Sequence, residues 1–473
     1  MLNRFFDALR GRATPPPAAQ SAPAAETLPL DQLRARLQRG EAAAVCPELH
    51  ELANRYPQDP DVLALYGGAL FELSVIDQAR AVLRTALYLR PDHAEALNTM
   101  GAMAAELDDP RDAVGWFEDA LEIAPDDLAA RYNLAQVLFL TGAYKRGFDL
   151  LRARHELLWG RANLMAPMPM WRGESLEGKR LLIWCDWGGL GDHLQFVRYV
   201  GWVKERARPA AIYIGAGLEF ARLFWHVTGS DGVSAPGHAP AVDVHCPLLD
   251  LPWLFGTDLD SVPAPIPYLW TVPAEVAQWG AQLAAAGLSD SQLRVGLAWK
   301  STGGAGEALI YQRMRRSKSI PAPALAALNV TILHPEGGLE GGSGLRSAVR
   351  FVSLQMGVDL HECAATGLTP IDCSAGISDF DSTAAVIANL DLVVSADTSV
   401  AHLAGAMGKP VLLLLRRESG MFWLHDREDS PWYPSMRILR QSQSGDWAPV
   451  LAQAADWLRR AAREGAAVII PPR

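Results

Sequence analysis

The sequence contains few cysteines, and none of them stands in a recognisable metal or redox motif. There are five in 473 residues, and no two are spaced as C-x-x-C: Cys46, Cys185, Cys246, Cys363 and Cys373. The odd number and the scattered positions predict free thiols in a reducing compartment. Ligands at the paired spacing that zinc requires are also missing, so we expect no structural zinc site.

Long apolar runs and a surplus of positive charge are missing as well. The longest apolar runs, such as 410–415, are far shorter than the roughly 20 residues that a membrane-spanning helix needs. The first residues, Met1–Arg12, mix Leu and Phe with Arg but lack a cleavage site after an apolar core, so they do not fit a signal peptide. We therefore expect a cytoplasmic protein without a transmembrane segment; a short amphipathic helix at Met1–Arg12 that touches a membrane or a partner is an alternative. The net charge of −10 argues against bulk nucleic-acid binding, which requires a cationic face.

Between residues 30 and 160 a pattern recurs every 34 residues. Pro57, Pro91 and Pro125 share this step, and small residues recur with them in each repeat. Small residues let two antiparallel helices approach closely, and proline ends the second helix because it has no N–H to donate. A 34-residue period predicts a tetratricopeptide-repeat (TPR) domain over 30–160, preceded by a disordered tail and Pro/Ala linker over 1–29. The repeats must stack to bury their apolar faces, which leaves a concave surface for a partner.

From about residue 165 the pattern changes to alternating strands and helices. The predicted strands are nearly continuous apolar runs, typical of buried parallel strands, at 180–185, 211–215, 242–245, 295–299, 331–334, 350–354, 392–395 and 411–415. This alternation predicts a doubly wound α/β fold. A Pro-rich stretch within 255–293 divides it, so we expect one Rossmann-like lobe over 165–275 and a second over 290–445. The remainder, 446–473, is expected to form a C-terminal helix that packs back across the first lobe, and a tail.

A glycine-rich turn follows the first predicted strand. Gly188, Gly189 and Gly191 stand directly before Asp192, where a helix is predicted over 192–206. Glycine lets the backbone turn tightly and lets a ligand approach closely. Asp192 is placed either to cap this helix, a contribution of about 1 kcal/mol, or to act on a substrate. The turn does not have the G-x-G-x-x-G order, and the chain has no Gly-Lys-Ser/Thr, which excludes a P-loop.

A second turn lies at the carboxyl end of another predicted strand. Asp397, Thr398 and Ser399 form this turn, and a helix of small residues that contains His402 follows. The free amides at the start of the helix and the two hydroxyl groups suit a phosphate. Ligands bind at the carboxyl edge of such sheets, so we expect an anion here. The alternative is a well-capped helix with a structural histidine.

A third candidate is a run of cations after the strand predicted at 295–299. Five of them stand within 299–319: Lys300, Arg313, Arg315, Arg316 and Lys318. Arginine offers bidentate contacts to phosphate and lysine offers a point charge, so such a loop suits a diphosphate leaving group. For each single member a solvated basic side chain is the alternative.

Together these segments resemble glycosyltransferase family 9, the heptosyltransferase-like group, and more closely its bacterial TPR-containing relatives. The resemblance rests on the Gly-Leu-Gly-Asp run at 189–192, on the turn and helix at 397–411, and on the Arg-Ser-Lys-Ser-Ile-Pro run at 316–321. It implies a GT-B fold, in which two Rossmann-like lobes follow the TPR α-solenoid and hold donor and acceptor between them. It also implies roles. Asp192 matches the catalytic base, while the 397–399 turn with His402, and Lys318 or a neighbouring arginine, match the donor-phosphate contacts.

The resulting hypothesis is an inverting glycosyltransferase that moves a sugar from a nucleotide-sugar co-substrate to an acceptor hydroxyl. Asp192 would accept the hydroxyl proton, and side-chain cations would carry the phosphate charge, so we expect neither a metal ion nor another cofactor. The TPR domain suggests that the acceptor is a protein or is delivered by one. The alternatives are a transferase acting on a glycolipid, a non-catalytic TPR scaffold with a relic GT-B domain, and a nucleotide-sugar epimerase.

Overall fold

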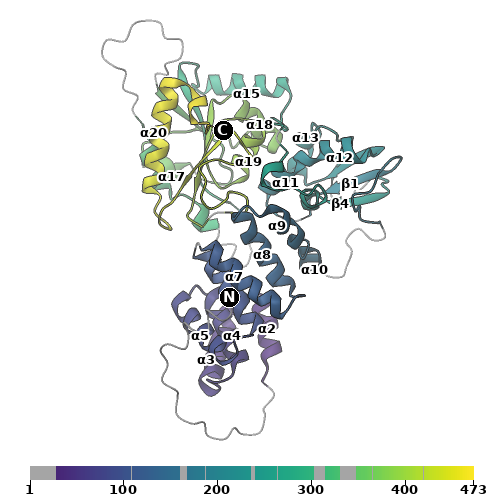
Figure 1. The fold of residues 1–473 in the computed structure, drawn as a ribbon. Helices are drawn as coiled ribbons and strands as arrows, with labels where there is room; N and C mark the ends of the chain where they lie inside the picture. Colours follow the sequence, from purple (N-terminus) through teal and green to yellow (C-terminus); the bar gives the residue numbers. More distant parts are fainter. Residues whose placement is uncertain are drawn as a thin grey trace. The chain divides into compact units, whose positions relative to one another are not determined.

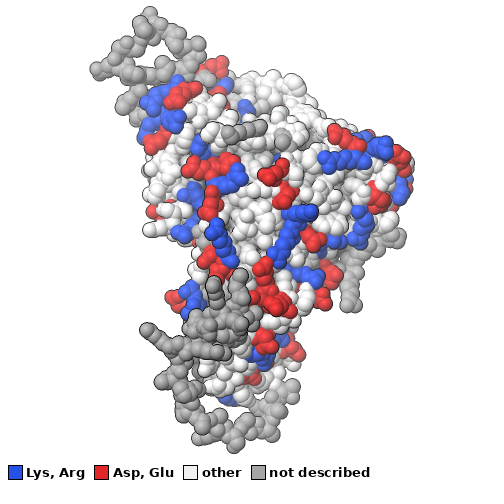
Figure 2. All heavy atoms as spheres, viewed as in Figure 1, with Lys and Arg blue, Asp and Glu red and all other residues white. Residues whose placement is uncertain are grey.

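The computed structural model describes most of the chain and divides it into two compact units, Met1–Leu134 and Ala135–Arg473. The described residues are 28–107, 109–159, 168–186, 188–235, 240–263, 265–302, 315–330, 348–358, 360–364, 366–418 and 420–472. Arg313 and the strand predicted at 331–334 lie outside these ranges. Among the described residues, no helix is both long and apolar enough to cross a membrane. On the face that Figure 2 shows, Lys and Arg are interspersed with Asp and Glu over the described surface.

The first unit consists of consecutive helices (Figure 1), namely α2 (Leu30–Gln38), α3 (Ala42–Arg55), α4 (Pro60–Glu72), α5 (Ile76–Leu89), α6 (Ala94–Glu106), α7 (Pro110–Ile123) and the first part of α8 (Leu128–Leu140). Small residues meet large ones where two helices pair. A Cβ added to Gly67 of α4 would lie 2.6 Å from Leu83 of α5, and one added to Gly101 of α6 would lie 2.7 Å from Phe117 of α7. The 34-residue recurrence in the sequence is therefore the recurrence of these close helix contacts.

The second unit begins inside α8 and continues with α9 (Tyr144–Leu151) and α10 (Arg154–Trp159). These helices are built into the α/β part of the chain. Tyr144 is fully buried, and Trp432 Nε1 donates to its hydroxyl at 3.0 Å. Phe148 stacks on Phe422 with ring centroids 6.1 Å apart. The last helices of the repeat region thus share a core with residues far along the chain, while the domain limits at 29 and 160 stay predictions.

The first lobe holds a parallel sheet whose described strands have the order β3-β2-β1-β4. The strands are β1 (Arg180–Trp184), β2 (Ala211–Gly215), β3 (Gly232–Ser234) and β4 (Val244–Pro247). Its helices are α11 (Leu190–Phe196), η1 (Val197–Tyr199), α12 (Val200–Ala207), η2 (Leu218–Phe220), α13 (Ala221–Phe224), η3 (Leu248–Asp250) and α14 (Leu251–Leu254). The chain then passes through η4 (Leu259–Ser261) and α15 (Pro273–Ala285) to the second lobe.

The second lobe holds a larger parallel sheet, whose described strands have the order β10-β9-β8-β5-β6-β7. The strands are β5 (Gln292–Ala298), β6 (Ala348–Ser353), β7 (Ile371–Asp372), β8 (Leu392–Ala396), β9 (Val411–Leu415) and β10 (Met436–Arg440). The helices are η5 (Ala322–Leu328), α17 (His361–Ala364), α18 (Phe380–Ala388), α19 (Ser399–Ala406), α20 (Ala448–Glu464) and η6 (Ala466–Ile469). Every residue of β8 and β9 is buried, which explains their unbroken apolar sequence.

The predicted fold class is confirmed, because a helical region precedes two parallel α/β sheets. The short strands β3, β7 and β10 were not predicted. All three are edge strands of the described sheets, and their apolar runs are short or mixed with charge. The expectation that the C-terminal helix packs on the first lobe is wrong. The buried face of α20, with Val450 and Leu458, joins the second-lobe core that contains Val295 and Leu412. A helix that directly follows the edge strand β10 covers its own sheet.

Candidate functional site

Asp192 lies at the start of α11, where the chain leaves β1 through the glycine turn. Its Oδ2 accepts the amide N–H of Gly189 at 2.6 Å, so the side chain does cap the helix. Gly188 has a φ of +99°, and a Cβ there would lie 2.6 Å from Asp192 Oδ2. Glycine is therefore needed at 188 for both the backbone conformation and the space.

The environment of Asp192 also suits proton transfer. The side chain is half-buried, and burial raises the pKa of Asp192 to about 6. The amide of Gly189 and the charge of Lys318 lower this pKa, though less than burial raises it. A carboxylate with a pKa near the working pH is the kind of group that serves as a general base. The cap and the candidate base are thus one side chain.

Asp397 and Lys318 form an ion pair in the second lobe. Lys318 Nζ lies 2.7 Å from Asp397 Oδ2, and the indole Nε1 of Trp423 donates to Asp397 Oδ1 at 2.9 Å. Burial alone would raise the pKa of Asp397, but the neighbouring Lys318, with its hydrogen bond, lowers it to about 2. Asp397 is therefore a permanent anion that holds Lys318 beside the start of α19.

His402 lies where the two lobes touch. It is buried in α19, and its Nδ1 is 3.0 Å from the hydroxyl of Tyr433. A Cβ added to Gly191 of α11 would lie 2.5 Å from His402 Cδ2, so α11 and α19 are in direct contact. Burial lowers the pKa of His402 to about 4, which keeps the ring neutral at pH 7.

Of the other predicted site residues, some lie at the start of α19 or near Lys318, and one is directed away from both. Thr398 is the N-cap residue of α19, and its hydroxyl oxygen is 3.1 Å from that of Ser395. Ser399 is the first residue of the helix, and both Thr398 and Ser399 are half-exposed. Arg316 is exposed, two residues before Lys318. Lys300 is directed elsewhere, since its Nζ pairs with Glu362 at 3.2 Å.

The sequence reasoning did not identify Arg198, which joins three segments of the second unit. The guanidinium donates to the hydroxyl of Tyr268 at 2.9 Å, to the carbonyl of Pro263 at 3.2 Å and to the carbonyl of Trp432 at 2.8 Å. The side chain is almost fully buried. A signal was present, because Arg198 stands four residues after Leu194 on the inward face of the helix predicted over 192–206.

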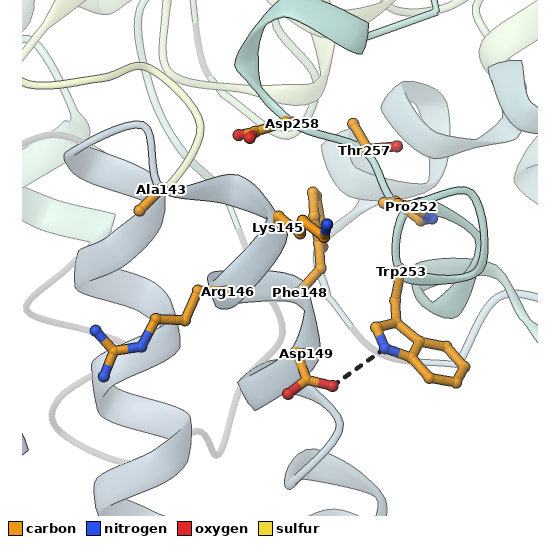
Figure 3. Close-up of a pocket in the computed structure, with 10 residues that line it drawn as sticks. Ala143, Lys145, Arg146, Phe148, Asp149, Pro252, Trp253, Thr257 and Asp258 are labelled. Atoms are coloured by element: carbon orange, nitrogen blue, oxygen red, sulfur yellow. Dashed lines mark hydrogen bonds between the residues drawn. The ribbon is translucent and has the colours of Figure 1, made fainter.

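A pocket of about 530 Å³ lies apart from this site, between α9 and the turn after α14 (Figure 3). It is lined by Ala143, Lys145, Arg146, Phe148, Asp149, Pro252, Trp253, Gly256, Thr257 and Asp258, none of which is a predicted site residue. Asp149 accepts a hydrogen bond from Trp253 Nε1 at 3.1 Å, which joins the helix to the first lobe.

The structure thus defines an α/β protein of two parallel-sheet lobes that follows a helical repeat region. Within it, residues 369–446 match the glycosyltransferase family 9 (heptosyltransferase) family. The matched segment contains β8, the Asp397 turn and α19. The resemblance to this family that the sequence motifs predicted is therefore confirmed.

Similar proteins extend over most of the chain. Protein FlbA of Caulobacter vibrioides is 26% identical over 490 residues, which cover 91% of this chain and 77% of that protein. A glycosyl transferase family 9 structure from Veillonella parvula has 12% identity and a TM-score of 0.45, and it covers 63% of this chain and 99% of its own. An O-GlcNAc transferase mutant from Thermobaculum terrenum has 13% identity and a TM-score of 0.31, with 93% of this chain and 92% of its own covered.

Proposed function

We propose that this chain is a glycosyltransferase that transfers a sugar from a nucleotide-sugar donor to an acceptor hydroxyl, with inversion at the anomeric carbon and without a metal ion. The observation that carries the proposal is Asp192, a half-buried carboxylate whose pKa is raised by burial to about 6. The charge of Lys318 acts on it across the contact of α11 with α19. A base and a cation next to a helix start are the two groups that this reaction needs.

The proposed chemistry assigns one role to each group. Asp192 accepts the proton of the acceptor hydroxyl while its oxygen attacks the anomeric carbon. The bond between that carbon and the donor phosphate breaks, and the electron pair leaves with the phosphate. Lys318 and the backbone amides at the start of α19 stabilise the charge that develops there. Such electrostatic stabilisation is usually the largest single contribution to catalysis.

Binding of UDP, ADP, GDP and CMP to the full chain, measured by calorimetry, tests the donor site directly. We expect one nucleotide to bind, with the product of transfer being the same nucleotide. If none of the four binds, the scaffold alternative is favoured over a live transferase.

We further propose that the acceptor is a protein, or is brought by one, and that the helical repeats recognise it. The support is architectural, because stacked repeats form a peptide-binding surface and carry no chemistry of their own. A clean test must spare α8 to α10, since Tyr144 and Phe148 are buried in the core of the second unit. Removal of residues 28–127 should abolish transfer to a protein acceptor and leave nucleotide binding intact. Equal transfer to a glycolipid with and without the repeats would instead favour the glycolipid alternative.

A further inference from the structure

A buried ion cluster lies beside the glycine turn of the first lobe and is formed by Arg154, His155, Asp186 and Asp250; we name it the Arg154 cluster. The Arg154 side chain is 1% exposed, and those of Asp186 and Asp250 are 0% and 4% exposed. Arg154 Nη2 lies 3.0 Å from Asp186 Oδ2 and 2.6 Å from Asp250 Oδ1. His155 Nε2 lies 3.0 Å from the same oxygen of Asp250. One guanidinium therefore bridges two buried carboxylates.

The two carboxylates stand at the carboxyl ends of neighbouring strands. Asp186 follows β1 and Asp250 ends η3, directly after β4, and β1 pairs with β4. Asp186 Oδ1 also accepts the amide N–H of Leu249 at 3.3 Å. Gly188, where the backbone turns through a φ of +99°, comes two residues after Asp186. The cluster thus fixes the point from which the glycine turn departs toward Asp192.

The arginine of this cluster comes from the helical region rather than from the sheet. Arg154 begins α10, and the preceding helix α9 is attached to the first lobe through the hydrogen bond from Trp253 to Asp149 (Figure 3). The Arg152 guanidinium lies 3.9 Å from the centre of the Trp253 ring. These contacts hold the start of α10 against the lobe and carry Arg154 into its interior.

Stability alone is a weak reason for such a cluster. The attraction within a buried ion pair often does not exceed the free-energy cost of removing both charges from water. Apolar side chains of similar volume often stabilise a core equally well. Geometry is the better reason, because the planar guanidinium presents several N–H groups in a fixed arrangement and can contact two carboxylates at once. A lysine at 154 would keep the charge but lose this double contact.

We propose that Arg154 is a positioning residue: by joining Asp186 to Asp250 it fixes the glycine turn that presents Asp192 to the acceptor hydroxyl. The role of Asp192 in this inference rests on the proposed function. Its mechanical part, that Arg154 fixes the conformation of the glycine turn, does not depend on that function. Arg154 touches no reacting atom. A helix of the repeat region therefore supplies a residue on which the acceptor side of the first lobe depends.

Hydrogen exchange on the full chain tests the mechanical part without any sugar donor. In Arg154→Lys we expect amides of 188–195 to exchange roughly tenfold faster than in the wild type, while those of 395–407 are unchanged. The matched control is Arg294→Lys. Arg294 forms a bidentate ion pair with Asp391, with Nη2 2.8 Å from Oδ1 and Nε 3.1 Å from Oδ2. This pair lies near the amino ends of β5 and β8, away from the glycine turn. If both variants leave the exchange of 188–195 as in the wild type, the proposal is overturned.

Kinetics test the catalytic part. We expect Arg154→Lys to lower kcat roughly tenfold while the KM for the donor stays within about twofold, because the donor contacts lie in the second lobe. The acid limb of the pH profile should move to higher pH, since a less neutralised Asp186 raises the pKa of Asp192. An unshifted profile, with kcat falling only as the folded fraction falls, would make Arg154 merely structural.

A second variant keeps the test decisive if Arg154→Lys does not fold. Asp186→Asn retains an oxygen for the Leu249 amide and removes one buried charge, and the proposal predicts the same faster exchange of 188–195. Wild-type exchange in that variant would overturn it. Faster exchange in a chain whose wild type transfers no sugar would support the link from Arg154 to the turn and overturn the proposed function instead.

Discussion

Each lobe places an aspartate where a buried strand turns into a helix, yet the two carboxyl groups are shifted in opposite directions. Asp192 follows β1 in the first lobe, and burial raises its pKa to about 6. Asp397 follows β8 in the second lobe, where burial is outweighed by Lys318, 2.7 Å away, so that the pKa falls to about 2. The local architecture is the same, and the directly paired cation makes the difference.

One kind of strand–turn–helix unit can thus serve two purposes, depending on the pKa of its aspartate. A carboxyl group with a pKa near 6 can both lose and accept a proton around neutral pH, as a general base must. A carboxylate with a pKa near 2 stays charged and can only hold other charges in place. In the proposed function the first lobe accepts the proton and the second lobe binds the anion, and substitutions at each position can test this separation.

The largest expected effect is that of Asp192→Asn. The amide can still accept the hydrogen bond from Gly189 but cannot accept a proton, so we expect kcat to fall on the order of a thousandfold. Nucleotide affinity should not change, because the proposed donor contacts are in the second lobe. Steady-state turnover with calorimetry of the nucleotide measures both. Wild-type turnover in this variant would refute the assignment of the base.

The second prediction concerns Lys318→Ala, which leaves Asp397 buried without its cation. We expect nucleotide affinity to fall roughly tenfold or more, which corresponds to about 1.4 kcal/mol or more. Lys204→Ala is the matched control, because Lys204 also lies 2.7 Å from an aspartate, Asp231, but on α12 of the first lobe. Equal losses in both variants, measured by calorimetry, would show that the effect is not specific to the site.

The third prediction is the pH dependence of kcat/KM. Asp192 must be deprotonated to act as a base, so kcat/KM should decrease as the pH falls through about 6, and about tenfold for each further pH unit. His402, with a pKa of about 4, is neutral throughout this range, so its titration does not change kcat/KM there. The profile should be flat above pH 7. An acid limb that persists unchanged in Asp192→Asn would belong to another group.

Local features of this molecule could be predicted from the sequence because they depend on neighbouring residues. The contact of Gly67 with Leu83 recurs one repeat later, and the buried strand β9 is an unbroken apolar run. The cap of α11 by Asp192 also follows from residues three apart. Periodicity, apolar runs and turn residues are all local signals, so the helical repeats and the parallel sheets were foreseen.

The partners of the charged residues could not be predicted in the same way. Arg154 meets Asp250 across 96 residues of sequence, and Arg198 meets the carbonyl of Trp432 across 234. Lys300 stands in the same predicted cationic loop as Lys318, but it pairs with Glu362 instead. Which cation reaches which anion is decided by tertiary packing, and a single sequence carries no pattern for it.

The smallest expected effect tests the contact between the two lobes. A methyl group at 191 would lie 2.5 Å from Cδ2 of His402, so Gly191→Ala forces α11 and α19 apart and should cost roughly 1 to 3 kcal/mol of stability. Gly189→Ala is the control, since its Cβ would meet only Asp192 Oδ2 at 3.7 Å, an ordinary contact. Thermal unfolding should separate the two variants. If the two lobes already move apart in solution, Gly191→Ala will have the same melting temperature as Gly189→Ala. The contact of α11 with α19 would then belong to one of several lobe arrangements rather than to a single fixed one.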